Sequence, residues 1–556
     1  MNGRITKIMV MLSLILSVFS AFAEEGDRPA LSKDIKILFT SDVHCAIDRG
    51  WGYGGIWAVR AAFSRNSHVL LVDDGDAIQG EPVGLLTKGG AIIDIMNATG
   101  YDIAIPGNHE FDYGLDRFLE LAGQADFPYI SCNFNKGGEL IFPPWVIREF
   151  DGTRIAFVGV TTPLTIREST PKHFMDDVGN YIYGFCQDET GEGVYQAVQR
   201  AVDSARAEGA DYVVVMAHMG NESEVTPWKY SDVIANTTGI DAWLDGHSHD
   251  MERVVMKNRA GRNVIRAACG TKNGFIGMLT ISKYGGMRAD LLPWIADISA
   301  PKLLNLSNPA TEAVAAVKGA LDEELQTVLA TATADLVIYD PVARMDDDRP
   351  LRIVQNAETN LGDLCADAYL SHFDGADIAL VNASGLRANL DQGDISCYDV
   401  LRTLPFGTKL DLIEVTGQQV LDALEWSVHA IPGEFGGFEH VAGLTYTVDA
   451  HIPSPCVQDE AGLFVRVDAE KPRRVGDVQI GGEPLSPEGK YKLVTNDFIL
   501  LDGNGFTMFR NAPLLESGEE DSRALLDYIT GPLGGVIGEA YADPYGQGRM
   551  TAIEYE

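Results

Sequence analysis

Five short apolar runs in the first half of the sequence each end in residues that can bind a metal ion or transfer a proton. The side chains that follow the runs are carboxylates, imidazoles and one amide, at Asp42 and His44, Asp76, Asn108 and His109, His218, and His247 and His249. Oxygen and imidazole ligands suit divalent metals such as Zn, Mn, Co or Fe. Open α/β sheets bind ligands beyond the carboxyl ends of their strands, so we expect the five loops to form one site, for more than one metal ion.

The segments that must position these loops are predicted to be strands alternating with helices. The five runs span residues 35–40, 68–72, 101–105, 211–217 and 240–244, and a sixth apolar run at 155–160 is followed by no obvious metal ligand. An amphipathic helical pattern at 191–209 precedes the run that ends at His218. This alternation over residues 33–300 predicts a sheet covered by helices.

A second domain is expected after the first. The chain has 556 residues, which predicts two or three domains. A helical pattern at 310–329 and a polar segment at 346–350 that ends in proline precede a second half with its own apolar periodicity. We expect residues 301–350 to form a linker that contains a helix, and residues 351–550 to form the second domain.

The first 23 residues have the pattern of a signal peptide. Arg4 and Lys7 precede an apolar run at 8–19, and Ala-Phe-Ala at 21–23 has the small-x-small form of a signal-peptidase site. We therefore expect an exported protein, periplasmic or extracellular. The alternative is an N-terminal membrane anchor, although the run is short for a span. No second apolar stretch is long enough for a membrane helix, so we expect no stable anchor after cleavage.

The chain is strongly acidic. Its net charge is −37, and removal of the two basic residues before position 24 gives −39. This field argues against a nucleic-acid polymer or an anionic membrane surface as partner, but a small phosphate ester can bind where metal ions reverse the local sign. The seven cysteines contain no C-x-x-C pair, which argues against a zinc knuckle or a thioredoxin-like site. The sequence leaves the disulfide pattern and the oligomeric state open.

Taken in order, the five motifs resemble the sequence blocks of the dinuclear metallophosphoesterases. The string Gly-Asn-His-Glu-Phe-Asp at 107–112 is similar to the signature of the exported bacterial 5′-nucleotidase branch. Three positions in the region 33–290 depart from the family pattern. The family usually has glycine at the position of Cys45 and commonly has an aliphatic residue at the position of Pro106. Some members have an amide at the position of His249. The resemblance implies an α/β fold, with a calcineurin-like four-layer α/β/β/α sandwich at 33–300 and a second, α+β nucleotide-binding domain.

The resemblance also implies how two metal ions divide the ligands. The first ion would be held by Asp42, His44, Asp76 and His249. The second would be held by Asn108, His218, His247 and the bridging Asp76. Two divalent ions about 4 Å apart can stabilise the attacking and leaving oxygens of an in-line displacement, and can activate a water molecule near neutral pH.

By the same resemblance, His109 would not be a metal ligand. It would lie beside the phosphate as a proton donor or charge stabiliser, held in place by Asp112. A carboxylate on the other ring nitrogen favours the imidazolium form and fixes the orientation of the ring. The spacing of three residues allows this contact if the loop turns into a helix.

Strings in the second half resemble the C-terminal nucleotidase domain of the same family, at 358–368, 382–387, 404–407, 438–443 and 496–506. The resemblance implies that Phe438 and Phe498 sandwich a nucleobase, and each stacked base contributes roughly 1–3 kcal/mol. The alternative for these rings is packing in the core. Arg387 lies where the family contacts its ligand, and a guanidinium suits a phosphate or carboxylate. Its alternative role is a surface salt bridge.

Two departures concern the sugar and the base. Asn504 stands where the family has an aspartate that accepts hydrogen bonds from ribose hydroxyls, and an amide oxygen accepts more weakly than a carboxylate. His440 stands where glutamine is common. The preferred sugar and base therefore stay open. With the metals on one domain and the base on the other, the resemblance implies that the linker carries a hinge rotation.

We predict a metal-dependent enzyme of nucleotide catabolism that hydrolyses nucleoside 5′-monophosphates to nucleoside and phosphate. Two alternatives use the same two-metal site: hydrolysis of UDP-sugars, and 2′,3′-cyclic nucleotide phosphodiesterase with 3′-nucleotidase activity. An alternative of another class is an exported binding or adhesion protein without turnover. The complete set of ligands argues against it.

Overall fold

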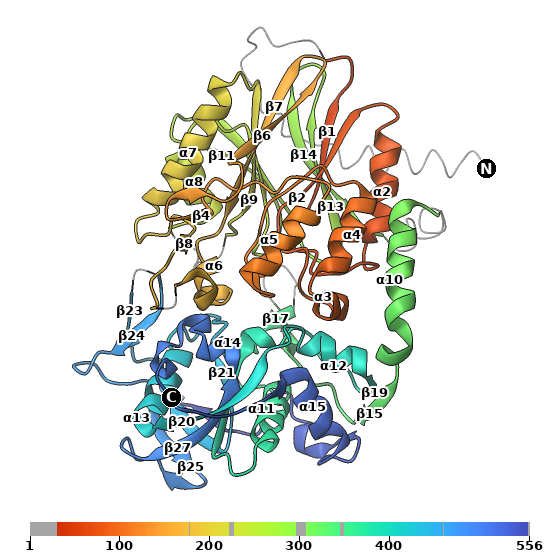
Figure 1. Ribbon diagram of the computed structural model, residues 1–556. Coiled ribbons are helices and arrows are strands. Elements are labelled where there is room, and N and C mark those ends of the chain that lie inside the picture. Colours follow the sequence, from red (N-terminus) through yellow and green to blue (C-terminus); the bar gives the residue numbers. More distant parts are fainter. Residues whose placement is uncertain are drawn as a thin grey trace.

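The computed structural model describes residues 31–176, 178–221, 227–295, 307–344, 350–459 and 461–553, without the side chains of 322–324. The expected signal peptide at 1–23 lies outside the described residues, as do residues 346–349 of the polar segment. Two domains are stacked, and helix α10 (Pro309–Leu325) runs along one side of them (Figure 1). None of the helices in the described ranges combines the length and the apolarity that a membrane span requires.

The first of two sheets in the N-terminal domain has the strand order β14-β13-β1-β2-β3. Strands β1, β2 and β3 run parallel, and β13 and β14 add an antiparallel edge. The strands are β1 (Ile35–Thr40), β2 (His68–Asp73), β3 (Ile103–Ala104), β13 (Phe275–Ile281) and β14 (Met287–Pro293).

The second sheet has the order β11-β12-β10-β9-β7-β6. Its four central strands are parallel, and β6 and β11 pair antiparallel at the two edges. The strands are β6 (Trp145–Phe150), β7 (Thr153–Thr161), β9 (Tyr212–His218), β10 (Ala242–Asp245), β11 (Met251–Lys257) and β12 (Asn263–Cys269).

Helices cover the outer faces of both sheets and complete four layers. Between the sheets lies an apolar core in which Phe39, Phe157 and Leu244 are fully buried. Helices α2 (Gly52–Phe63) and α4 (Gly90–Thr99) lie on the side of the first sheet, and α7 (Glu192–Ala207) and α8 (Tyr230–Asn236) on the side of the second (Figure 1). The predicted α/β/β/α sandwich is therefore confirmed. The shorter elements are α3 (Pro82–Thr87), η1 (His109–Phe111), α5 (Leu115–Gln124), β4 (Asn135–Lys136), β5 (Glu139–Leu140), α6 (Thr165–Glu168), η2 (Pro171–Phe174) and β8 (Tyr183–Gly184).

The segment between the domains differs from the expected linker at 301–350. Helix α10 ends at Leu325, four residues before the predicted end, and its apolar face packs against α2 and α4. The chain then enters β15 (Val328–Ala332), which pairs with β19 (Gly393–Ser396) and β29 (Val536–Ile537). Residues 328–332, inside the expected linker, thus pair with strands from much later in the chain, and the domain boundaries stay a prediction.

The C-terminal domain is centred on a five-stranded sheet with the order β21-β18-β27-β20-β28. Its strands are β18 (Ile378–Asn382), β20 (Lys409–Thr416), β21 (Glu439–Ala442), β27 (Lys490–Asn496) and β28 (Leu514–Glu520). One continuous apolar core joins this sheet to its helices. These are α11 (Asn360–His372), α12 (Cys397–Thr403), α13 (Gly417–Ser427), α14 (Asp497–Leu500) and α15 (Asp521–Thr530).

Smaller sheets and turns surround this core. A four-stranded sheet contains β22 (Leu444–Val448), β25 (Val475–Ile480), β26 (Glu483–Pro484) and β30 (Met550–Ala552). Two-stranded pairs are β16 (Tyr339–Arg344) with β17 (Pro350–Arg352), and β23 (Cys456–Gln458) with β24 (Phe464–Val467). The 3-10 turns are η4 (Ala383–Gly385), η5 (Gly503–Gly505), η6 (Thr507–Phe509) and η7 (Glu539–Tyr541).

Candidate metal centre

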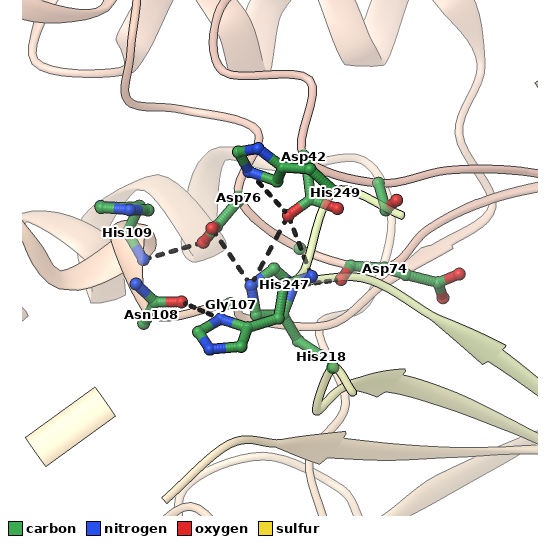
Figure 2. A network of polar contacts seen from close by, with 12 residues as sticks. Asp42, Asp74, Asp76, Gly107, Asn108, His109, His218, His247 and His249 are labelled. Atoms are coloured by element: carbon green, nitrogen blue, oxygen red, sulfur yellow. Dashed lines mark hydrogen bonds and ion pairs between the residues drawn. The ribbon is translucent and has the colours of Figure 1, made fainter. Parts of the chain in front are cut away.

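The five loops expected to carry metal ligands meet at one place, where the strands of the N-terminal domain end. Strand β1 ends two residues before Asp42, β9 ends on His218 itself, and β10 ends two residues before His247. Side chains from these loops point toward one another (Figure 2). The structure therefore brings these segments together, and their role as metal ligands stays a prediction.

Two sets of three side chains have their ligand atoms within 4.8 Å of one another. The first set is Asp42, His44 and His249. The second set is Asp42, Asp76 and His218. The Nε2 atoms of His44 and His249 lie 3.1 Å apart, and Nε2 of His218 lies 3.1 Å from Oδ2 of Asp76. Two sets of this composition, joined by a common carboxylate, suit a pair of neighbouring divalent ions.

The remaining two expected ligands adjoin this cluster. The Nδ1 atom of His247 lies 3.0 Å from Oδ1 of Asn108, and the backbone N–H of His247 donates to Asp42. In the structure Asp42 belongs to both sets, while the expected bridge, Asp76, lies 3.9 Å from His44 and 3.1 Å from His218. The position of Asp76 between the sets is compatible with a bridge, and the division of ligands between two ions stays a prediction.

Buried atoms without partners provide a test of whether these residues fit metal ions. Oδ2 of Asp42 is buried and has no hydrogen-bond partner, and the buried Nε2 of His218 has only its ion-pair contact with Asp76. A buried polar atom without a partner costs roughly 1–3 kcal/mol. A divalent ion bound to these atoms would remove that cost, so the residues fit metal ions.

The backbone of the ligand loops is strained. Asp42, His44, Asp76, His247 and His249 all have left-handed backbone angles, with φ of 51°, 46°, 59°, 82° and 54°. Each non-glycine residue in this region costs of order 1–3 kcal/mol, and such residues persist only where surrounding structure holds them. Here the N–H groups of Asp42 and His44 donate to the carbonyls of Gly75 and Asp76 at 2.9 Å.

The electrostatic environment favours the metal-binding protonation states of His44, His249 and Asp76. It favours the opposite states of Asp42 and His218, since, in spite of burial, Asp76 and Asp42 raise the pKa of His218 well above its ordinary value. Burial lowers the pKa of His44 and of His249 well below the ordinary value, so both imidazoles are neutral. Burial alone would raise the pKa of Asp76, but His218 and the other nearby imidazoles lower it well below its usual range. Burial raises the pKa of Asp42 to about 7. Neutral imidazoles and ionised carboxylates are the forms that coordinate metals.

Backbone carbonyls orient two of the imidazoles. The Nδ1 atom of His218 lies 2.8 Å from the carbonyl oxygen of Asp74, and the Nδ1 atom of His44 lies 3.1 Å from that of Gln79. These contacts leave Nε2 of each ring for the cluster, the usual arrangement for metal-binding histidines. The side chain of Asp74 points away from the cluster (Figure 2), so its carbonyl and not its carboxylate contributes.

Glu110 was not among the predicted site residues, yet it joins two ligand loops. Its buried carboxylate accepts hydrogen bonds from the backbone N–H groups of Asp76, Ala77 and Gly107 at 2.6 to 2.8 Å, and of Ile78 at 3.4 Å. These N–H groups belong to the loops that carry Asp76 and Asn108. The available signal in the sequence was its place inside the string at 107–112.

His109 and Asp112 have the predicted contact. The Nδ1 atom of His109 lies 2.6 Å from Oδ2 of Asp112, because the loop turns into η1. Burial lowers the pKa of His109, but the carboxylates of Asp112 and Asp76 outweigh burial and raise it overall. The backbone N–H of His109 donates to Oδ1 of Asp76 at 2.8 Å, which places this residue directly beside the candidate ligands.

Two protein-family models match this chain and identify its family. A model described as calcineurin-like phosphoesterase matches residues 35–251, and a model described as 5′-nucleotidase, C-terminal domain, matches residues 333–511. Together the two models match more than half of the chain. The chain belongs to the 5′-nucleotidase family of metallophosphoesterases. The predicted class, a metal-dependent phosphoric monoester hydrolase, is confirmed at the level of this family.

Individual relatives that match nearly all of this chain agree with this assignment. The 5′-nucleotidase of Vibrio parahaemolyticus is 25% identical over 586 residues, which cover 94% of this chain and 95% of that protein. The trifunctional nucleotide phosphoesterase protein YfkN of Bacillus subtilis is 25% identical over 94% of this chain, but the match spans only 39% of that protein. The crystal structure of a 5′-nucleotidase precursor from Thermus thermophilus has a TM-score of 0.74 and 25% identity, covering 94% of this chain and 100% of that one.

The second domain of this 5′-nucleotidase family member contributes Arg387 and Phe406 beside the metal centre. The Phe406 ring lies 5.9 Å from the His109 ring, and the Arg387 guanidinium lies 5.8 Å from the Phe406 ring. Burial, with the nearby Arg352, lowers the pKa of Arg387 to about 10, while Asp76 and Asp112 act in the opposite direction. The structure therefore places Arg387 within electrostatic reach of the candidate ligands, and its contact with a bound ligand stays a prediction.

A cleft of about 470 Å³ lies between the domains. Asp112 and Tyr113 line it from one domain, and Phe406 and Phe498 from the other. Phe438 does not line it, which differs from the expected pair of stacking rings. The ring of Phe438 is 1% exposed and packs in the C-terminal core, edge-on to His440. In this arrangement only Phe498 of the expected pair faces the cleft.

Asn504 forms part of a chain of polar side chains at the ends of β18 and β27. Asn496 donates to Asn382, Asn382 donates to Ser384, and the Ser384 hydroxyl donates to Oδ1 of Asn504 at 3.0 Å. One acceptor position of the Asn504 oxygen is thus already used. Asn504 is 4% exposed and does not line the cleft, and its amide carries N–H groups that a carboxylate in its place would lack.

Proposed function

We propose that this protein is an exported hydrolase of nucleoside 5′-monophosphates that works with two divalent metal ions. The observation that carries the proposal is a cluster of buried ligand atoms, some without partners, beside the His109–Asp112 pair and next to a cleft between the domains. Family membership and the nucleotidase relatives support the same reaction. Export rests on the signal-peptide pattern of the first 23 residues.

The residues of the centre have distinct tasks in this reaction. Bound metal ions would supply Lewis acidity and a nucleophile at neutral pH. Asp42, Asp76, His218 and the adjoining ligands hold those ions. His109 donates from Nε2 to a phosphoryl oxygen, since Nδ1 is engaged by Asp112. The raised pKa of His109 favours the protonated ring, which would stabilise the charge that develops on the phosphoryl group.

The cleft would receive the nucleoside. Phe498 offers an aromatic face to the base, and such stacking contributes roughly 1–3 kcal/mol. Arg387 adds positive charge near the phosphate, which matters in a chain with a net charge of −37. Stacking of Phe438 on the base would require that its ring leave the core, and its role stays a prediction.

Replacing His109 by alanine tests the proposed reaction. Phosphate release from AMP is measured for the wild-type protein and for His109→Ala, with the metal content of both determined. We expect at least a hundredfold lower kcat with unchanged metal content, within the usual contribution of a proton-donating group. Equal activity of the two proteins with metals bound would remove His109 from the mechanism.

A second candidate is hydrolysis of other nucleotide phosphoesters at the same centre, specifically UDP-sugars or 2′,3′-cyclic nucleotides. The engaged oxygen of Asn504 favours it, because the usual carboxylate for ribose hydroxyls is missing. A panel of AMP, UDP-glucose and 2′,3′-cyclic AMP, tested with each divalent metal, separates these substrates. Absence of both bound metal and turnover, after metals have been added, would instead favour a binding protein.

A further inference from the structure

The second domain lies against one side of the candidate metal centre. Asp42, Asp76 and His218 are almost fully buried, and Phe406 and Arg387 lie on the side of the centre that carries His109. Separation of the domains would open this side of the centre to a nucleotide. Contacts that hold the domains together therefore bear directly on the site.

Glu81 makes such a contact. It directly precedes α3, and only 4% of its surface is exposed. The Tyr398 hydroxyl donates to Oε2 of Glu81 at 3.0 Å, and Nε of Arg402 lies 3.5 Å from the same oxygen. Both partners belong to α12 of the other domain, which lies beside α3 (Figure 1).

The other oxygen of Glu81 is held within the N-terminal domain. Oε1 lies 3.3 Å from Nη1 of Arg49 and 3.7 Å from Nζ of Lys272. Each domain thus contacts a different oxygen of the Glu81 carboxylate. When the domains separate, Oε2 loses both of its partners, while Oε1 keeps positive charge beside it. Loss of the contact with α12 therefore leaves the charge of Glu81 compensated.

The segment that ends in Glu81 also holds His44. The Gln79 carbonyl oxygen contacts Nδ1 of His44 at 3.1 Å, and the backbone N–H of Glu81 donates to the carbonyl of His44 at 3.1 Å. Between them, Gly80 has φ of 141°, and a Cβ on it would lie 2.5 Å from the Cβ of His44. Such close packing transmits any shift of residues 79–81 to His44.

We propose that Glu81 is a positioning residue that couples the docking of the C-terminal domain to the placement of His44 in the metal centre. Tyr398 and Arg402 fix Oε2 when the domains meet, and the 79–81 segment then holds the His44 ring toward its partners. The inference rests on the proposed function for the role of His44, but not for the contacts themselves. It assigns to Glu81, Tyr398 and Arg402 an effect on the metal site without direct contact to a ligand atom.

The test uses full-length variants in which only residues of the C-terminal domain are substituted. Tyr398→Phe, Arg402→Gln and the double variant leave the metal-binding domain unaltered. Metal affinity is measured in the full-length protein by competition between Zn²⁺ or Mn²⁺ and a coloured chelator. We expect the double variant to bind one of two ions about tenfold more weakly, which corresponds to about 1.4 kcal/mol. Arg402→Lys should restore most of the affinity, because it returns the charge.

Two controls separate coupling from a general loss of structure. Arg466→Gln removes an exposed arginine that pairs with Asp468, and it should leave metal affinity unchanged. In a Glu81→Gln background, the Arg402→Gln change should have no further effect, provided that thermal melting shows the background variant to be folded.

Metal affinity of the double variant within twofold of wild type would overturn the proposal. So would a full additional loss from Arg402→Gln in the Glu81→Gln background. Failure of the proposed function is a separate outcome: if the wild-type protein hydrolyses no nucleotide, the metal titration still decides the role of Glu81.

Discussion

Replacing Glu110 by glutamine tests how the ligand loops are held. Oε2 of Glu110 accepts from the N–H groups of Asp76 and Gly107, and Oε1 accepts from those of Ala77 and Ile78. Glutamine converts one oxygen into an NH₂ group, which donates and cannot accept. Whichever way the amide turns, two backbone N–H groups lose their acceptor.

The structure gives the size of the effect. Hydrogen bonds to a charged group contribute about 1.5–3 kcal/mol each. The pair on Oε1 includes the long bond from Ile78, so an amide that gives up this weaker pair costs about 3 kcal/mol, and the other orientation costs more. The loop of Asp76 or the loop of Asn108 then loosens. Loss of groups that orient metal ligands typically lowers metal affinity about 10–100-fold, and we expect Glu110→Gln to fall in that range.

Chelator competition and thermal unfolding measure the two consequences. Glu139→Gln, at an exposed glutamate of β5, is the matched control, because it removes the same charge away from the centre. Metal affinity of Glu110→Gln within twofold of the control, together with an equal melting temperature, would show that Glu110 does not hold the ligand loops.

Two further predictions concern the C-terminal domain. Phe498→Ala should raise KM for AMP about tenfold, by loss of stacking of roughly 1–3 kcal/mol, with kcat changed less than threefold in steady-state assays; an unchanged KM would exclude this ring from the base site. Burial lowers the pKa of His440 to about 4, so below an ordinary value of about 6.5 the unfolded chain binds a proton that the folded chain does not. Stability therefore falls as the pH drops from 6.5 toward 4, by about 3 kcal/mol in all. The free energy of unfolding, measured at pH 7 and pH 4.5, should fall less in the His440→Gln variant than in the wild-type protein. The same fall in both proteins would contradict this prediction.

The sequence predicted the ligand segments because their pattern is local. An apolar run followed by Asp-x-His or by His-x-His indicates a strand end, and parallel strand ends meet at one edge of a sheet. The contact between His109 and Asp112 was predictable for the same reason, since three residues span one turn.

Other features depend on neighbours that a single sequence does not identify. The role of Glu110 arises from backbone groups in a loop more than 30 residues away. Left-handed angles at Asp42 and His44 are imposed by the loop that follows β2. A strand was not expected inside the linker, because β15 becomes recognisable as a strand only beside β19 and β29. The burial of Phe438 depends on how the C-terminal core closes around it.

An anomalous-difference map from crystals grown with Mn²⁺ or Zn²⁺ shows directly whether two metal ions share Asp76. We expect two peaks about 4 Å apart, both within bonding distance of Asp76. One of them should be bound by His44 and His249, and the other by His218. A single peak, or peaks away from these side chains, would rule out the proposed two-metal centre.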